Sequence, residues 1–91
     1  MNKNLSIAIG NRIRMRRRVL KLSMLSLSKS IGVSQPQLLR YEKGMRQISA
    51  AQLFQIAIVL DTPLDWFFTD CFLYFGDIAN PKKPMKNEYL K

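Results

Sequence analysis

The chain has 91 residues, of which 47% are hydrophobic, with one cysteine and no histidine. A chain this short accommodates one domain and buries only about 60 to 65% of its unfolded surface, which leaves little room for an enclosed catalytic cleft. The lone Cys71 excludes an internal disulfide framework, and the absence of histidine removes the commonest metal ligand and acid–base group. We therefore expect a binding module with no catalytic residue, no cofactor and no metal.

Positive charge is concentrated in the first half of the chain. Residues 1–46 hold eleven Lys and Arg against one acidic residue, and residues 47–91 hold four against five. Each cation that neutralises a phosphate releases a counterion, so this charge suits nucleic acid, although a solvated helix face has the same composition. No apolar run approaches the ~20 residues of a membrane span, and the first residues lack the apolar core of a signal peptide, so the expected compartment is the cytoplasm.

The first predicted helix runs to about Leu20, and Asn4 or Ser6 can cap its start. A second helix follows a short connection, with Ser23 as its cap. Gly32 ends this helix, because glycine adopts the left-handed conformation that a tight turn requires. The residues that we expect to face inward from these two helices are Leu5, Ile9, Ile13, Leu20, Leu27 and Ile31.

Capping boxes predict the starts of the third and fourth helices. Ser34 and Gln37 form the first box, and Ser49 and Gln52 form the second. Pro36 suits the first turn of the third helix, where its missing N–H costs nothing, and Gly44 offers a stop for that helix. The expected inward residues are Leu38 and Tyr41 in the third helix, and Leu53, Ile56, Ala57 and Leu60 in the fourth.

A fifth helix is predicted from Pro63, a residue suited to the first helical position, to about Thr69. Trp66, Phe67 and Phe68 supply the bulk that closes the core. The expected organisation is one all-α domain at residues 1–70 and a C-terminal extension at 71–91, whose last residues from Asn80 have the composition of a mobile tail. The structure of the segment from 71 to 78 stays ambiguous, and whether it is a dimerisation segment is left open.

Two short helices joined by a glycine-containing turn, the second with a polar outer edge, form a unit that fits the ~12 Å major groove of DNA. Several short residue strings in and around this unit match a known family in the same order and spacing. They are Ile9-Gly10, Arg12-Ile13-Arg14, Leu27, Ile31-Gly32-Val33-Ser34, Tyr41-Glu42-Lys43-Gly44, Ile48-Ser49-Ala50, Gln55-Ile56-Ala57, Val59-Leu60 and Phe67-Phe68. Through them, residues 9–68 resemble the Cro/repressor-type helix-turn-helix family of bacterial and phage regulators. The resemblance implies a compact five-helix bundle of the lambda-repressor-like type, with helices two and three as the helix-turn-helix.

The resemblance assigns the contacts with base edges to Gln35, Pro36, Gln37 and Arg40 of the third helix. Gln can make a bidentate contact with adenine and Arg with guanine, and each good pair contributes about 1 to 3 kcal/mol of base discrimination. Pro36 can contact only apolar groups. The alternative is that the two glutamines solvate a helix end and Arg40 is an ordinary surface cation.

Phosphate contacts are expected at the start of the second helix, at Ser23 and Met24, because free N–H groups there attract anions. Further candidates are Lys43, Arg46 and Gln47 after the third helix. Lys43 and Arg46 can instead compensate the charge of a helix C-terminus. Four other arginines spread round the first helix, and most of them are expected to contribute a general positive field rather than contacts: Arg12, Arg14, Arg16 and Arg18.

Three residues depart from the family pattern. Met24 stands where relatives have a glutamine that reaches a phosphate, and Met24 cannot donate a hydrogen bond. Leu39 replaces a polar residue beside the base-reading edge, and Ser28 replaces an alanine or glycine. Leu39 can therefore contact a thymine methyl group, contact protein, or weaken DNA binding.

Glu42 is the only acidic residue among the first sixty, which predicts a specific partner for it. Helical phase places both Arg16 and Arg17 beside the apolar stripe of the first helix and does not choose between them. The resemblance implies that Arg17 is the partner, in a structural ion pair that ties the first helix to the end of the third.

Aromatic residues are dense late in the chain, with more side chains than a five-helix domain buries easily: Trp66, Phe67, Phe68, Phe72, Tyr74 and Phe75. Family members commonly dimerise through the region after the fourth helix, and a two-fold dimer presents its recognition helices about 34 Å apart. The alternative is that residues 72–75 pack onto their own core. Cys71 is most simply a buried or idle thiol.

These features predict a sequence-specific double-stranded DNA-binding transcriptional regulator, a repressor that acts by occupancy and as a homodimer. A related alternative is an antitoxin-like protein that also holds a toxin through its aromatic C-terminal region. Alternatives of another class are a basic amphipathic membrane-surface protein and an RNA-binding protein that binds by charge alone. The arginines surround the first helix instead of lying opposite an apolar face, which argues against the membrane-surface alternative.

Overall fold

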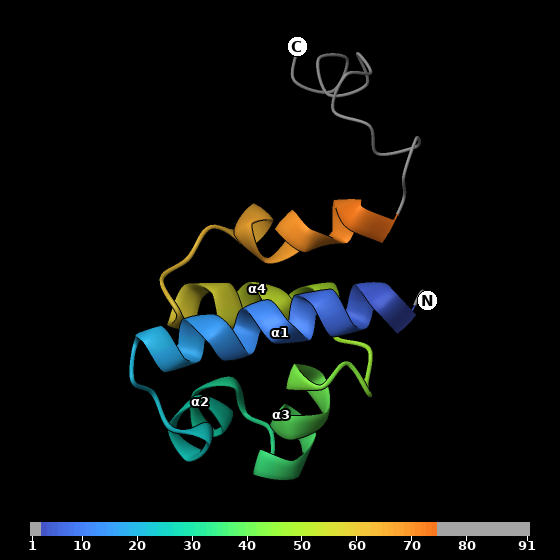
Figure 1. Ribbon diagram of the computed structural model, residues 1–91. Coiled ribbons are helices and arrows are strands. Elements are labelled where there is room, and N and C mark those ends of the chain that lie inside the picture. The colour runs from blue at the N-terminus through green and yellow to red at the C-terminus, as the bar shows by residue number, and fades with distance from the viewer. Residues whose placement is uncertain (1–2, 75–91) are drawn as a thin grey trace.

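The computed structural model describes residues 3–74, in which every regular element is a helix (Figure 1). Its elements are the α-helices α1 (Lys3–Val19), α2 (Met24–Ile31), α3 (Gln35–Glu42) and α4 (Ala50–Val59), and the 3₁₀ helix η1 (Leu64–Tyr74). The predicted five-helix, all-α fold is confirmed. The tail expected from Asn80 lies outside the described residues. None of the helices within residues 3–74 has the length and apolar character needed to cross a membrane.

Helix α1 occupies the middle of the fold (Figure 1). It packs against α3 on one side and against η1 on the other, while α2 packs against both α3 and α4. Because α2 and α3 lie on the side of α1 away from η1, the helix-turn-helix stands at one end of the molecule, and its outer surface is not covered by another described element.

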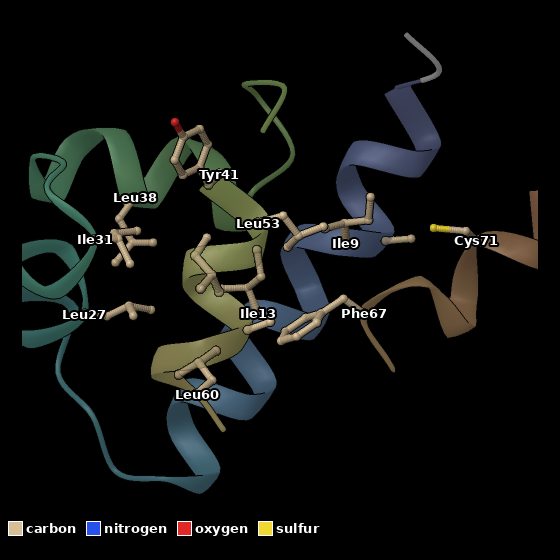
Figure 2. Packing of buried hydrophobic residues seen from close by; sticks show 13 residues of the cluster. Ile9, Ile13, Leu27, Ile31, Leu38, Tyr41, Leu53, Leu60, Phe67 and Cys71 are labelled. Atoms are coloured by element: carbon tan, nitrogen blue, oxygen red, sulfur yellow. The ribbon is translucent and has the colours of Figure 1, made fainter. Parts of the chain in front are cut away.

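The core draws side chains from every helix (Figure 2). Burying a large apolar side chain contributes roughly 1.5 to 3 kcal/mol, so these contacts set how the five helices pack. The apolar residues with no exposed surface are Ile13, Leu27, Leu38, Ile56, Leu60 and Phe67.

Three of the predicted helix caps are confirmed. The hydroxyl groups of Ser23, Ser34 and Ser49 accept hydrogen bonds from backbone N–H groups three residues later, at 2.9, 3.2 and 3.0 Å. Each bond satisfies one of the free N–H groups at the start of α2, α3 or α4. The glutamines of the two predicted capping boxes bond elsewhere: Gln37 accepts from Arg40, and Gln52 donates to the carbonyl of Ile31 at 3.1 Å.

The predicted cap of the first helix is wrong. Helix α1 begins at Lys3, so Asn4 and Ser6 both lie inside it. This early start has a packing reason: Leu5 is half-buried against the core, and the helical backbone of the first turn is what brings its side chain there.

The fifth helix differs from the prediction in type and length. It is a 3₁₀ helix that starts at Leu64, one residue after Pro63, and continues beyond Thr69 to Tyr74. Phe67 and Cys71, four residues apart, are both buried in the core, so packing continues past the expected end. The domain boundary expected at residue 70 therefore falls within η1.

Candidate nucleic-acid interface

Helices α2 and α3 are joined by a tight turn centred on Gly32. Gly32 has φ 73°, and a Cβ atom there would meet nothing within 4 Å, so the backbone conformation rather than crowding favours glycine. Its N–H donates to the carbonyl of Lys29, and the N–H of Val33 donates to that of Ser28 at 3.0 Å. Together with the buried side chains between α2 and α3, these bonds make the two helices one rigid unit.

The four residues assigned to base contacts lie at the outer surface of α3. Gln35, Pro36 and Arg40 are exposed and Gln37 is half-buried. The Arg40 guanidinium donates to the Gln37 side-chain oxygen at 3.3 Å, so these two groups are held side by side on the surface. The inner face of α3 is formed instead by Leu38 and Tyr41, as the sequence predicted.

The end of α3 is held by an ion pair between Arg17 and Glu42. The Arg17 Nε and Nη2 atoms donate to the two oxygens of Glu42 at 2.7 and 3.0 Å, and Nη1 donates to the carbonyl of Leu22 at 3.0 Å. Glu42 is 2% exposed and Arg17 is 9% exposed, so both charges are compensated inside the protein. The bidentate contact keeps the pKa of the Arg17 guanidinium above its ordinary value. The structure therefore forms the pair that the resemblance implied.

Backbone contact reinforces this pair. Gly10 of α1 lies against the last turn of α3, where an added Cβ would overlap the carbonyl of Tyr41 and come within 2.6 Å of the carbonyl oxygen of Glu42. Helix α1 can approach α3 this closely only because residue 10 has no side chain. Gly10 and Arg17 together fix the orientation of α3 relative to α1.

The five candidates for phosphate contact fall in two places. Ser23 and Met24 stand at the start of α2, where the Ser23 hydroxyl already accepts the capping bond and Met24 is half-buried against the core. Lys43, the exposed C-cap of α3, lines the same groove as Met24. Arg46 and Gln47 are exposed in the following loop, and Arg46 lines a separate recess beside Ile9. The structure thus brings Met24 and Lys43 together and leaves Arg46 apart.

Two arginines of α1 make specific contacts that the sequence did not predict. Arg12 forms a bidentate ion pair with Asp70 of η1 at 2.8 and 2.9 Å, and its guanidinium lies 4.5 Å from the centre of the Trp66 ring. Arg16 donates to the Thr62 hydroxyl at 2.7 Å. The Arg12 hydrogen bonds lower the pKa of the Asp70 carboxyl. Arg12 thus fastens α1 to η1, and Arg16 fastens α1 to the loop between α4 and η1. Two of the four arginines expected mainly to contribute a general field are therefore held by protein contacts.

The described residues offer little for metal binding or nucleophilic chemistry. Within residues 3–74 there is no group of three Cys, Asp, Glu or His side chains placed to hold a metal ion. Burial raises the pKa of the Cys71 thiol, which disfavours the reactive thiolate.

Comparison with known proteins identifies the fold. A family model described as "Helix-turn-helix" matches residues 13–67, which include α2, the Gly32 turn and α3. The chain belongs to the Cro/repressor-type helix-turn-helix family. Members of this family are DNA-binding transcriptional regulators and not enzymes, which confirms the prediction that the chain is not an enzyme.

Named relatives of this helix-turn-helix protein are regulators. This chain is 45% identical over 62 residues to a transcriptional regulator in the ATPase CF(0) region of Rhodospirillum rubrum, and the alignment covers 68% of this chain and 57% of the relative. It is 38% identical over 66 residues to an HTH-type transcriptional regulator of Sinorhizobium medicae, covering 72% of this chain and 48% of the relative. The chain thus spans about half the length of these relatives.

Solved structures agree on the architecture. The restriction-modification controller protein C.AhdI from Aeromonas hydrophila matches with a TM-score of 0.65 and 26% identity, over 68% of this chain and 94% of its own. A helix-turn-helix transcriptional regulator from Vibrio cholerae matches with a TM-score of 0.69 and 26% identity, over 77% of this chain and 39% of its own.

Proposed function

We propose that this helix-turn-helix protein is a sequence-specific double-stranded DNA-binding regulator that represses by occupancy and places α3 in the major groove. The observation that carries the proposal is the outer surface of α3, where Gln35 and Arg40 are exposed and the half-buried Gln37 has its side-chain oxygen beside the Arg40 guanidinium. Glutamine and arginine are the side chains that make bidentate contacts with adenine and guanine.

A rigid frame supports this assignment. Specific base contacts need side chains held in register with the groove, and the Arg17–Glu42 pair and the Gly10 contact hold α3 against α1 at its C-terminal end. Phosphate contacts would then position the domain on the duplex. We assign them to the start of α2 at Ser23 and Met24, to Lys43, and to the loop residues Arg46 and Gln47.

Base selectivity tests the proposal. Selection of bound sites from random duplex DNA defines the preferred sequence. The affinities of Arg40→Ala and Lys43→Ala are then measured for that sequence and for versions of it with single base changes. We expect Arg40→Ala to lose about 1 to 3 kcal/mol of discrimination at one base position, because its guanidinium contacts a base edge. Lys43→Ala should weaken all sequences alike and reduce the salt dependence, because its ammonium contacts phosphate.

Two outcomes would contradict the assignment. Equal losses on every sequence for Arg40→Ala would remove this residue from base recognition. Stronger binding to single-stranded RNA than to duplex DNA, with no effect of the α3 substitutions, would indicate an RNA-binding protein that acts through charge.

We further propose that the regulator is a two-fold dimer. Apolar side chains are exposed on α4, at Phe54 and Ile58, and at the end of η1, at Phe72 and Leu73, with exposed fractions from 57 to 77%. Exposed apolar residues grouped on two elements favour a protein partner, and a second copy of the chain is the partner that a palindromic binding site requires. The selected DNA sites should then contain two half-sites about 34 Å apart.

A further inference from the structure

A groove of about 590 Å³ runs between α1, the start of α2 and the end of α3. Arg14 and Arg18 of α1 line one side, and Leu39 and Lys43 line the side formed by α3. The Arg17–Glu42 pair also contributes to the lining, and its two charges compensate each other. The net charge of the groove therefore comes from the other cations.

Three of these cations have no protein partner. Among residues 3–74, no hydrogen bond or ion pair involves the side-chain nitrogens of Arg14, Arg18 or Lys43, and all three residues are exposed. This separates Arg14 and Arg18 from Arg12, Arg16 and Arg17 on the same helix, whose guanidinium groups are engaged. Of the three arginines of α1 that line the groove, Arg17 is thus engaged with Glu42, and Arg14 and Arg18 are left free by the protein contacts.

The spacing of the free cations suits a repeating polyanion. Arg14 and Arg18 lie one helical turn apart, about 6 Å along the axis of α1, and Lys43 stands on the opposite side of the groove. A row of charges on two elements neutralises successive phosphates of a strand better than it neutralises one small anion.

The position relative to α3 points to one strand of the duplex. An α-helix about 10 to 12 Å across fills the ~12 Å major groove, so the two sugar–phosphate strands pass along its flanks. Leu39 and Lys43 belong to α3 and also line this groove, so the groove is a flank of the proposed recognition helix.

The family departures Met24 and Leu39 both line this groove, together with Met45. We propose that the groove seats one DNA sugar–phosphate strand, with Arg14 and Arg18 making phosphate contacts and Met24, Leu39 and Met45 contacting deoxyribose carbons. The arginines then replace the phosphate contact that the Met24 side chain cannot make, while the backbone N–H groups at the start of α2 stay available. This inference rests on the proposed function and adds α1 to the DNA-contacting elements.

The salt dependence of duplex binding measures these contacts. With the selected duplex, binding of Arg14→Gln/Arg18→Gln is followed by fluorescence anisotropy over a series of salt concentrations. Each lost phosphate contact lowers the slope of log K against log salt by about 0.9, so we expect a slope smaller by about 1.8 and binding weaker on the order of 30-fold near 0.15 M salt. Base preference should stay unchanged.

The matched control is Lys21→Gln/Lys29→Gln, which removes the same charge from exposed residues that do not line the groove. We expect a clearly smaller change in slope, because these residues contribute only through the long-range field. Asn11→Lys provides a second variant that adds a cation to an exposed residue lining the groove. It should increase the slope by about 0.9, and it tests the proposal even if the double arginine variant fails to fold.

Phosphate ethylation interference locates the contacts. Ethylated phosphates that block binding of the unchanged protein should stop interfering in Arg14→Gln/Arg18→Gln and continue to interfere in the lysine control. Equal slopes and equal interference for the arginine and lysine variants would overturn the groove proposal and leave the proposed function intact. Failure of the unchanged protein to bind any duplex at low salt would instead overturn the proposed function.

Discussion

Arg17 makes more polar contacts than any other arginine described in residues 3–74, joining α1 to Glu42 of α3 and to the Leu22 carbonyl. Removing one member of a buried pair leaves the other charge without compensation. We therefore expect Arg17→Ala to lower the free energy of unfolding by about 3 to 5 kcal/mol in urea denaturation. Arg14→Ala, at an exposed residue on the same helix, should change it by less than about 0.5 kcal/mol.

A double substitution distinguishes the effect of an uncompensated buried charge on stability from the effect of lost packing. Arg17→Met/Glu42→Leu removes both charges, so we expect it to be more stable than Arg17→Ala. A double variant that is less stable than Arg17→Ala would show that packing, rather than charge compensation, dominates at this site.

The stability that the Arg12–Asp70 ion pair between α1 and η1 provides depends on pH through the Asp70 carboxyl. Because the pKa of Asp70 is lowered by Arg12, its contribution to stability is present above the ordinary aspartate pKa of about 3.9 and is lost as the pH falls through the lowered value. Asp70→Asn should therefore have a lower melting temperature than the unchanged protein at neutral pH, and the difference should shrink below about pH 4. A difference that persists undiminished in acid would contradict an electrostatic role for the carboxylate.

The two ion pairs, Arg17–Glu42 and Arg12–Asp70, show how far the sequence predicts the contacts of single residues. The isolated Glu42 indicated that a partner was needed, but helical phase left Arg16 and Arg17 equivalent, and the family resemblance made the choice. No comparable signal connected Arg12 with Asp70, which lie 58 residues apart, because their contact depends on how η1 packs against α1. Which arginines of α1 bond to protein groups, and which stay free, likewise depends on the tertiary structure.

At the scale of helices, the crossing of α1 and α3 depends on the absence of a side chain at Gly10. We expect Gly10→Ala to cost about 1 to 3 kcal/mol in urea denaturation, because the new methyl group overlaps the carbonyl of Tyr41 and forces the two helices apart. Asn11→Ala, at the next and exposed residue, is the control and should be nearly neutral. If Gly10→Ala proved as stable as the control, α1 and α3 would not be in backbone contact.

The starts of α2, α3 and α4 were more predictable than the start of α1 or the extent of the last helix. The caps of α2, α3 and α4 are local, since a serine bonds to an N–H three residues later, and the Ser-x-x-Gln spacing at α3 and α4 predicts such bonds directly. The second bond of each capping box was not formed, because Gln37 and Gln52 found partners elsewhere. The type and length of η1 depend on burial of Phe67 and Cys71 by other helices, which periodicity within η1 does not reveal.

At the scale of the whole molecule, the apolar surface of α4 tests the proposed dimer. Ile58 is 64% exposed, so Ile58→Glu should leave the fold intact and convert the dimer to a monomer in light-scattering measurements, because a dimer would have to bury the new charge. Met15→Glu, at an exposed apolar residue of α1, should remain dimeric. A protein that is monomeric without substitution, or an Ile58→Glu variant that stays dimeric, would remove α4 from the interface.

Helices α2 and α3 lie on one side of α1, and η1 lies on the other (Figure 1). This arrangement also places positive and negative charge on different sides of α1. Within residues 3–74 the acidic residues other than Glu42 are Asp61, Asp65 and Asp70, all in or just before η1, so this part of the chain has an electric dipole whose positive end is the helix-turn-helix. The field of a polyanion exerts a torque on such a dipole during diffusion. Collisions with DNA are therefore biased toward the α3 end before any contact forms, and added salt should slow association by weakening that bias.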